Sequence, residues 1–234
     1  MDSIAFKAVD FGIQLAVILF AISFHESAHA WSALKFGDTT ARDAGRISLN
    51  PIRHLDPFGS VLLPLMMYFL SGGRMIFGAA KPTPVNLANT RNPRLANLVV
   101  SAAGPVSNFL LSAIALTALL VIKQADRRSI WDLYLATLPQ GQHFAAGALA
   151  PINYVLYLFA LVNVFLGVFN LIPIPPLDGS GIVLSVFGAS IAPLYAALSR
   201  FGFLILIGLL YLGVLNWVFG PIYFLVRRLI FGGL

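Results

Sequence analysis

The chain has 234 residues, of which 59% are hydrophobic and only 10% are charged. A soluble domain is typically about a quarter charged, so this chain has too few charged residues to cover a surface that faces water. Its formal net charge of +6 is spread over short runs between long apolar stretches. Such runs favour Lys and Arg beside a membrane. Composition therefore excludes an ordinary soluble enzyme, a disordered tail and an ordinary nucleic-acid binder.

The apolar stretches predict an all-α, polytopic membrane protein with four to six crossings, in a single domain over residues 1–234. A membrane helix needs about 20 apolar residues. The strong candidates in chain order are residues 11–34, 95–122, 151–172 and 201–226, separated by polar loops that include 35–57 and 123–150. Two shorter apolar runs cover residues 58–70 and 179–192. We find no internal repeat and no linker long enough to separate two domains.

The region between the first two strong spans is predicted to be a short re-entrant β-hairpin and helix. Residues 58–70 contain Pro64 and extend for roughly 20 Å as a helix, which is short for a crossing. Residues 46–50 and 75–85 have the pattern of short extended segments. Lys and Arg are more numerous on the side that holds loop 35–57, which predicts a cytoplasmic location for that loop. The same count leaves the side of the C-terminus open.

The first span contains a metal-binding pattern, His25-Glu26-Ser27-Ala28-His29, which fits H-E-x-x-H. Residues four apart share a helical face, so His25 and His29 can present two imidazoles to one ion. Glu26 is the only glutamate of the chain, and a charge within an apolar span is costly enough to indicate function. The pattern predicts a zinc site with Glu26 as general base. Capping of buried polar groups and a proton relay in a transporter are the alternatives.

A third zinc ligand must come from elsewhere in the chain, because a catalytic zinc usually has three protein ligands. The remaining candidates are His54, His143 and the aspartates. Asp178 stands out because it follows three prolines that interrupt an apolar run. Non-helical backbone is tolerated at membrane depth only around a buried site or a cavity. A helix cap without a metal is the alternative for Asp178, and spacing alone does not decide between the two.

Together, residues 25–29 and 170–179 resemble the site-2 protease family of intramembrane zinc metalloproteases (peptidase family M50). That family pairs H-E-x-x-H on one transmembrane helix with N-x-x-P and L-D-G on a later one. The resemblance implies that His25, His29 and Asp178 bind one zinc ion and that Glu26 is the base. Residues 45–51, 54–59, 77–84 and 104–108 resemble the compact bacterial branch without a PDZ insert, whereas Ser180 replaces a glycine of many relatives.

The resemblance also suggests roles for three further residues close to the substrate or its oxyanion. Asn170 would help to hold the substrate carbonyl, with a helix-to-helix hydrogen bond as the alternative. Gly104 and Asn108 are four residues apart on one helical face, where close helix packing is the default and support of the site is the alternative.

The implied function is zinc-dependent endopeptidase cleavage in or near a transmembrane segment, known as regulated intramembrane proteolysis. The expected partners are the lipid bilayer and a membrane protein substrate with a transmembrane helix, and no nucleic acid is expected. The expected location is a bacterial plasma membrane, crossed several times, with the active site toward the cytoplasm. A metal or proton transporter and an inactive member that only binds membrane helices are the alternatives.

Overall fold

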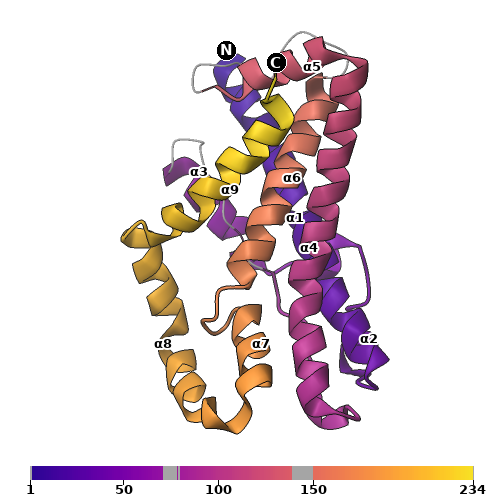
Figure 1. Cartoon of the computed structure of the whole chain (residues 1–234), viewed down its shortest axis with the longest axis vertical. Helices are drawn as coiled ribbons and strands as arrows, with labels where there is room; N and C mark the ends of the chain where they lie inside the picture. The colour runs from indigo at the N-terminus through magenta and orange to yellow at the C-terminus, as the bar shows by residue number, and fades with distance from the viewer. Residues whose placement is uncertain (1, 71–77, 79, 139–149, 234) are drawn as a thin grey trace.

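The computed structural model describes residues 2–70, 78, 80–138 and 150–233, and in these ranges the chain is helical with no strand (Figure 1). The long helices α1, α4 and α6 stand side by side and form the body of the molecule. The elements in chain order are α1 (Asp2–Lys35), α2 (Thr40–Asp43), η1 (Pro51–His54), η2 (Pro57–Leu62), α3 (Leu63–Leu70), η3 (Leu87–Asn89), α4 (Pro93–Ala125), α5 (Arg127–Ala136), α6 (Ala150–Asn170), α7 (Asp178–Phe187), η4 (Gly188–Ser190), α8 (Ala192–Tyr211) and α9 (Val214–Phe231).

Among the residues that the structure describes, five helices are long and apolar enough to cross a membrane, and this confirms the all-α membrane fold with four to six crossings. They are Lys7–Lys35 of α1 together with α4, α6, α8 and α9. Two shorter apolar helices, Pro57–Met66 and Asp178–Phe187, accompany them. The chain is a multi-pass membrane protein.

The predicted last span, residues 201–226, is wrong as a single helix. The chain turns between α8 and α9 at Gly213, whose φ of +69° is the left-handed conformation that glycine adopts without strain. The apolar run continues through this turn, so hydrophobicity alone did not locate it. Predicted loop 123–150 likewise contains α5, which Asp126 begins by accepting hydrogen bonds from the backbone N–H groups of Arg128 and Ser129.

Within the segment between α1 and α4, the part from His54 to Lys81 begins and ends at the same place. The N–H of Lys81 donates a hydrogen bond to the carbonyl of His54 at 3.0 Å, so these two residues lie side by side. Between these ends, η2 and α3 extend along α1, and the hydroxyl of Tyr68 donates to the carbonyl of Lys7 at 2.9 Å. The helical part of this region therefore reaches the N-terminal end of α1.

The β-hairpin predicted for this region is wrong for the residues that the structure describes. At residues 46–50, the carbonyl of Ser48 accepts from Ser27 Oγ at 2.5 Å and from His54 Nε2 at 2.7 Å. The guanidinium of Arg46 donates a hydrogen bond to the carbonyl of Arg53 at 2.8 Å. Side chains thus bind backbone groups that a strand ladder would need. Within the other expected strand, residues 75–77 and 79 lie outside the described ranges.

Small side chains allow the three central helices to approach closely. Ala21 and Ala30 of α1, Ala96 of α4 and Ala160 of α6 are fully buried. Close backbone approach of this kind is the usual way in which helices pack in a membrane. It brings the polar side chains in the middle of α1, α4 and α6 within hydrogen-bonding distance of one another.

Candidate metal centre

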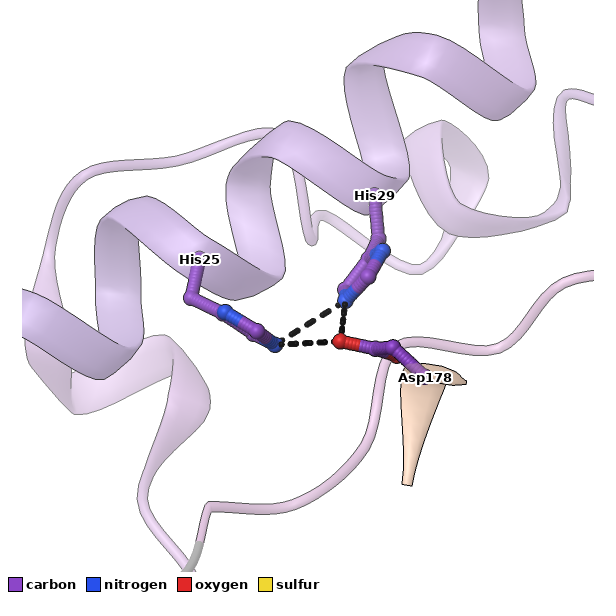
Figure 2. A group of neighbouring side chains, drawn as sticks. All are labelled: His25, His29 and Asp178. Atoms are coloured by element: carbon purple, nitrogen blue, oxygen red, sulfur yellow. Dashed lines mark hydrogen bonds and ion pairs between the residues drawn. The ribbon is translucent and has the colours of Figure 1, made fainter. Parts of the chain in front are cut away.

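His25 and His29 occupy one face of α1 and point toward the same space (Figure 2). Both side chains are buried, and their Nε2 atoms are 3.0 Å apart. The imidazole planes are nearly perpendicular, at 85°. This arrangement follows directly from the i, i+4 spacing in a continuous helix.

Asp178, the first residue of α7, completes a group of three. Its Oδ2 lies 3.1 Å from Nε2 of His25 and 3.4 Å from Nε2 of His29 (Figure 2). Gly179 permits this placement because its Cα packs against the backbone carbonyl of Leu171, where a side chain would collide. The glycine lets the first turn of α7 fold back against the end of α6.

The hydrogen bonds on the far side of each imidazole direct the Nε2 lone pairs into the centre of this group. His29 Nδ1 faces the backbone carbonyl of Val100 at 2.7 Å, and His25 Nδ1 faces Oδ1 of Asn108 at 2.6 Å. Both of these oxygens only accept, so each Nδ1 carries the proton and each Nε2 of a neutral imidazole has a free lone pair. No hydrogen-bond donor of the described chain satisfies the buried Oδ2 of Asp178.

These donors fit a divalent cation. Two imidazole Nε2 atoms and one carboxylate oxygen converge at separations of 3.0–3.4 Å. Ligands about 2.0–2.1 Å from a tetrahedral zinc ion would be roughly 3.3 Å from one another. Two histidines and one carboxylate are also a known ligand set for catalytic zinc, and each imidazole has the second hydrogen bond that such ligands usually make.

Helix α4 closes one side of the group. A Cβ atom at Gly104 would lie 2.5 Å from Cε1 of His25 and 2.5 Å from Nε2 of His29. The backbone of α4 therefore lies directly against both imidazoles. This contact requires glycine, and it supports the interpretation of Gly104 as a packing residue of the site.

Helix α4 also holds α7, and with it Asp178. The guanidinium of Arg94 donates to the carbonyls of Ser185 and Val186, both at 2.6 Å. Asn97 donates to the carbonyl of Gly181 at 3.0 Å. A cation at the C-terminal end of a helix interacts favourably with its last carbonyls. The position of Asp178 relative to the histidines thus depends on α4.

Glu26, the predicted base, lies beside the histidines and is held by the segment that returns from η2 and α3. Thr83 N–H donates to Oε2 of Glu26 at 2.7 Å, and Thr83 Oγ1 donates to the Glu26 carbonyl at 3.1 Å. Glu26 is half-buried, unlike the two histidines.

The other predicted site residues have different environments. Asn108 is fully buried and binds His25, which makes it a partner of a candidate ligand. The amide of Asn170 donates to the carbonyl of Leu166 in its own helix at 2.9 Å, and its proposed oxyanion role stays a prediction. Asp56 accepts from the N–H of Gly59 and caps η2. His143 lies outside the described residues.

Sequence reasoning missed Thr83 and Asn163. Thr83 acts through its backbone N–H, which no side-chain pattern reveals. Asn163 is fully buried in α6. It acts on the candidate ligands only indirectly, because its Oδ1 accepts a hydrogen bond from Asn108 at 2.8 Å. An amide in the middle of an apolar span could have indicated this position, because polar groups there need a partner.

Comparisons with known proteins place the chain in a family. The sequence model of "Peptidase family M50" matches residues 13–212. "Putative zinc metalloprotease YwhC" of Bacillus subtilis (strain 168) is 36% identical over 88% of this chain and 84% of its own length. "Putative zinc metalloprotease Rip2" of Mycolicibacterium smegmatis is 29% identical over 91% of this chain and 73% of its own length. The protein of the same name from Mycobacterium tuberculosis (strain H37Rv) is 31% identical over 92% of this chain and 73% of its own length. No solved structure matches the chain at comparable significance. The chain belongs to peptidase family M50.

Proposed function

We propose that the chain is a zinc-dependent intramembrane endopeptidase of the site-2 type, which hydrolyses a peptide bond in or near a transmembrane segment of another membrane protein. The observation that carries this proposal is the convergence of His25 Nε2, His29 Nε2 and Asp178 Oδ2 inside a bundle of membrane helices. The relatives named as zinc metalloproteases support zinc as the metal.

His25, His29 and Asp178 would hold one zinc ion per chain. When bound, zinc polarises the scissile carbonyl and makes water a stronger nucleophile at neutral pH. The hydrogen bonds from His25 Nδ1 to Asn108 and from His29 Nδ1 to the carbonyl of Val100 keep both imidazoles in the orientation that zinc binding needs.

Glu26 would carry the proton through the reaction. Its carboxylate takes a proton from the attacking water and gives it to the leaving amine of the cleaved peptide. The N–H of Thr83 binds Oε2 and so fixes the direction of the carboxylate. General acid–base catalysis of this kind contributes about 10²–10⁴-fold to the rate.

The depth of the site supports a membrane protein substrate. His25 precedes the end of α1 at Lys35 by ten residues, which is about 15 Å along the helix. A peptide bond that reaches Glu26 must therefore enter the bundle from the bilayer or from its surface. The excess of Lys and Arg on the side of loop 35–57 supports a site that opens toward the cytoplasm.

Metal analysis together with mapping of new protein N-termini tests the proposal. We expect about one zinc ion in both the wild type and Glu26→Gln, because Glu26 is outside the ligand set. In membranes of expressing cells, new N-termini within or beside transmembrane segments should occur with the wild type and not with Glu26→Gln. A wild-type protein without zinc, or equal sets of N-termini, would overturn the proposal.

A further inference from the structure

Two buried amides connect the metal centre to α6. Asn108 of α4 and Asn163 of α6 are both fully buried. Asn163 Nδ2 donates to the carbonyl of Phe159 at 2.8 Å, and Asn108 Nδ2 donates to Oδ1 of Asn163 at 2.8 Å. The chain of hydrogen bonds ends at Nδ1 of His25, 2.6 Å from Oδ1 of Asn108.

The direction of these hydrogen bonds follows mainly from the backbone carbonyl of Phe159, which is 2.8 Å from Asn163 Nδ2, whereas the carbonyl of Ala21 is 3.4 Å from Asn108 Nδ2. The Phe159 oxygen only accepts, so Asn163 must present its NH₂ group to it and its oxygen to Asn108. Asn108 must then present its own NH₂ group to Asn163 and its oxygen to His25. His25 has to supply the proton, which places that proton on Nδ1 and the lone pair on Nε2.

We propose that Asn163 is a positioning residue for the metal ligand His25, which it controls through Asn108 without touching the metal. This inference rests on the proposed zinc site. Burial makes the control strong, because an amide that turned over would place two donors or two acceptors against each other between two fully buried side chains. Asn163 thereby selects the imidazole tautomer that can bind the ion.

Loss of the Asn163 amide removes this selection. In Asn163→Leu the NH₂ group of Asn108 would retain only the carbonyl of Ala21, at 3.4 Å, as a partner. The Asn108 amide could then turn and offer its NH₂ group to Nδ1 of His25. That orientation favours a proton on Nε2, where it blocks the lone pair that faces Asp178.

Asn153 provides a matched control on the same helix. It is also fully buried, and it binds the carbonyl of Ser129 at 3.3 Å but has no link to His25. Asn153→Leu therefore makes the same chemical change in α6 without disturbing the amide chain. Any general effect of replacing a buried asparagine in α6 should occur in both variants.

The experiment is a zinc titration of the detergent-purified wild type, Asn163→Leu and Asn153→Leu. We expect the zinc Kd of Asn163→Leu to rise about 10–100-fold, as for other residues that orient metal ligands, and that of Asn153→Leu to stay within about 2-fold. A second readout is the ¹⁵N spectrum of labelled histidine in the metal-free protein, which should show the His25 proton move from Nδ1 to Nε2. Where Asn163→Leu does not fold, Asn163→Ala tests the same loss.

A double variant separates positioning from mere packing. Asn108→Asp presents an accepting oxygen to His25 in either orientation, so it no longer needs Asn163 to direct it. Asn108→Asp/Asn163→Leu should therefore bind zinc more tightly than Asn163→Leu alone, by about 10-fold or more.

The outcomes distinguish this inference from the proposed function. A wild type that binds no zinc would overturn the zinc site itself. A wild type that binds zinc, with equal affinities in Asn163→Leu and Asn153→Leu or no recovery in the double variant, would overturn the role of Asn163 alone.

Discussion

The backbone N–H of Thr83 donates a 2.7 Å hydrogen bond to Oε2 of Glu26, 57 residues earlier in the chain. The bond joins the returning segment between η2 and η3 to the middle of α1. It aligns the proposed base without using a side chain. The neighbouring residues Pro82 and Pro84 have no N–H, so Thr83 is the one donor in this tripeptide.

Thr83→Pro should therefore lower kcat while zinc stays bound. Proline removes the N–H, and a carboxylate that is free to turn is a poorer base, so we expect a loss of about 10-fold or more. Thr83→Val is the matched control, since it removes the hydroxyl that binds the Glu26 carbonyl but keeps the N–H. Turnover and zinc content of the purified variants check this. Equal turnover in the two variants would show that the bond does not direct the base.

Gly104→Ala should weaken zinc binding. The added methyl group would lie 2.5 Å from atoms of both imidazoles, so the rings or α4 must move. Overpacking of this kind typically costs about 1–3 kcal/mol. Gly208→Ala in α8 is the control, because a Cβ there meets no atom within 4 Å. We expect zinc loss only in Gly104→Ala, measured as metal per chain after dialysis. Full zinc content in that variant would contradict the close contact.

Asp178→Asn should release zinc, whereas Asp56→Asn should retain it. Both are aspartates at the start of a helical segment, but only Asp178 faces the histidines. The Asp56 carboxylate accepts from Gly59 N–H, so its loss should reduce stability by about 0.5–2 kcal/mol, as for other helix caps. Zinc content and the unfolding midpoint of both variants check this. Zinc retained in Asp178→Asn would require a different third ligand.

Asp38 should make stability depend on pH below about pH 4. Burial acts to raise the pKa of Asp38, but hydrogen bonds from Thr40, Asn86 and Asn89 outweigh it and hold the pKa below its ordinary value of 3.8. A depressed folded-state pKa stabilises the protein above the unfolded pKa, and this contribution is lost as pH falls through the folded pKa. Asp38 lies in the turn after α1, outside the membrane helices.

Asp38→Asn should thus lower the unfolding midpoint at pH 7, with a cost of about 1–3 kcal/mol for the unsatisfied buried donors. The difference from the wild type should shrink between pH 4 and pH 3, because the wild type loses the same contribution there. Asp43→Asn at the exposed end of α2 should change the midpoint less. A difference that stays constant from pH 7 to pH 3 would contradict the depressed pKa.

Local patterns predicted much of the site. The i, i+4 spacing of His25 and His29 places both rings on one face of any helix, whatever packs against it. The three prolines before Asp178 interrupt a helix at a position where an interruption needs a buried site. Neither pattern contains the distance between α1 and α7, and in the sequence only the family resemblance joined Asp178 to the two histidines; the structure places the three side chains together.

The predictions of secondary structure were wrong where the pattern of apolar residues does not distinguish between the alternatives. The turn at Gly213 lies within a continuous apolar run, so hydropathy predicted one helix where the chain forms two. Residues 46–50 have an extended pattern, but His54 and Ser27 bind the carbonyl of Ser48 in place of a neighbouring strand. Backbone partners of this kind depend on the surrounding fold, and sequence propensity contains no information about them.

The sequence by itself determined the class of protein, the number of membrane helices to within the predicted range, and the chemical types of the candidate metal ligands. Each of these depends on composition or on residues within one or two turns of a helix. Only the tertiary structure decided that Asp178 meets both histidines, that Thr83 binds Glu26 and that Asn163 reaches His25 through Asn108. These contacts join residues 55 or more positions apart in the chain. The link from Asn163 through Asn108 to His25 needs close packing of α1, α4 and α6, which buried small residues allow, whereas Asp178 and Thr83 are brought in by α7 and by the segment before η3.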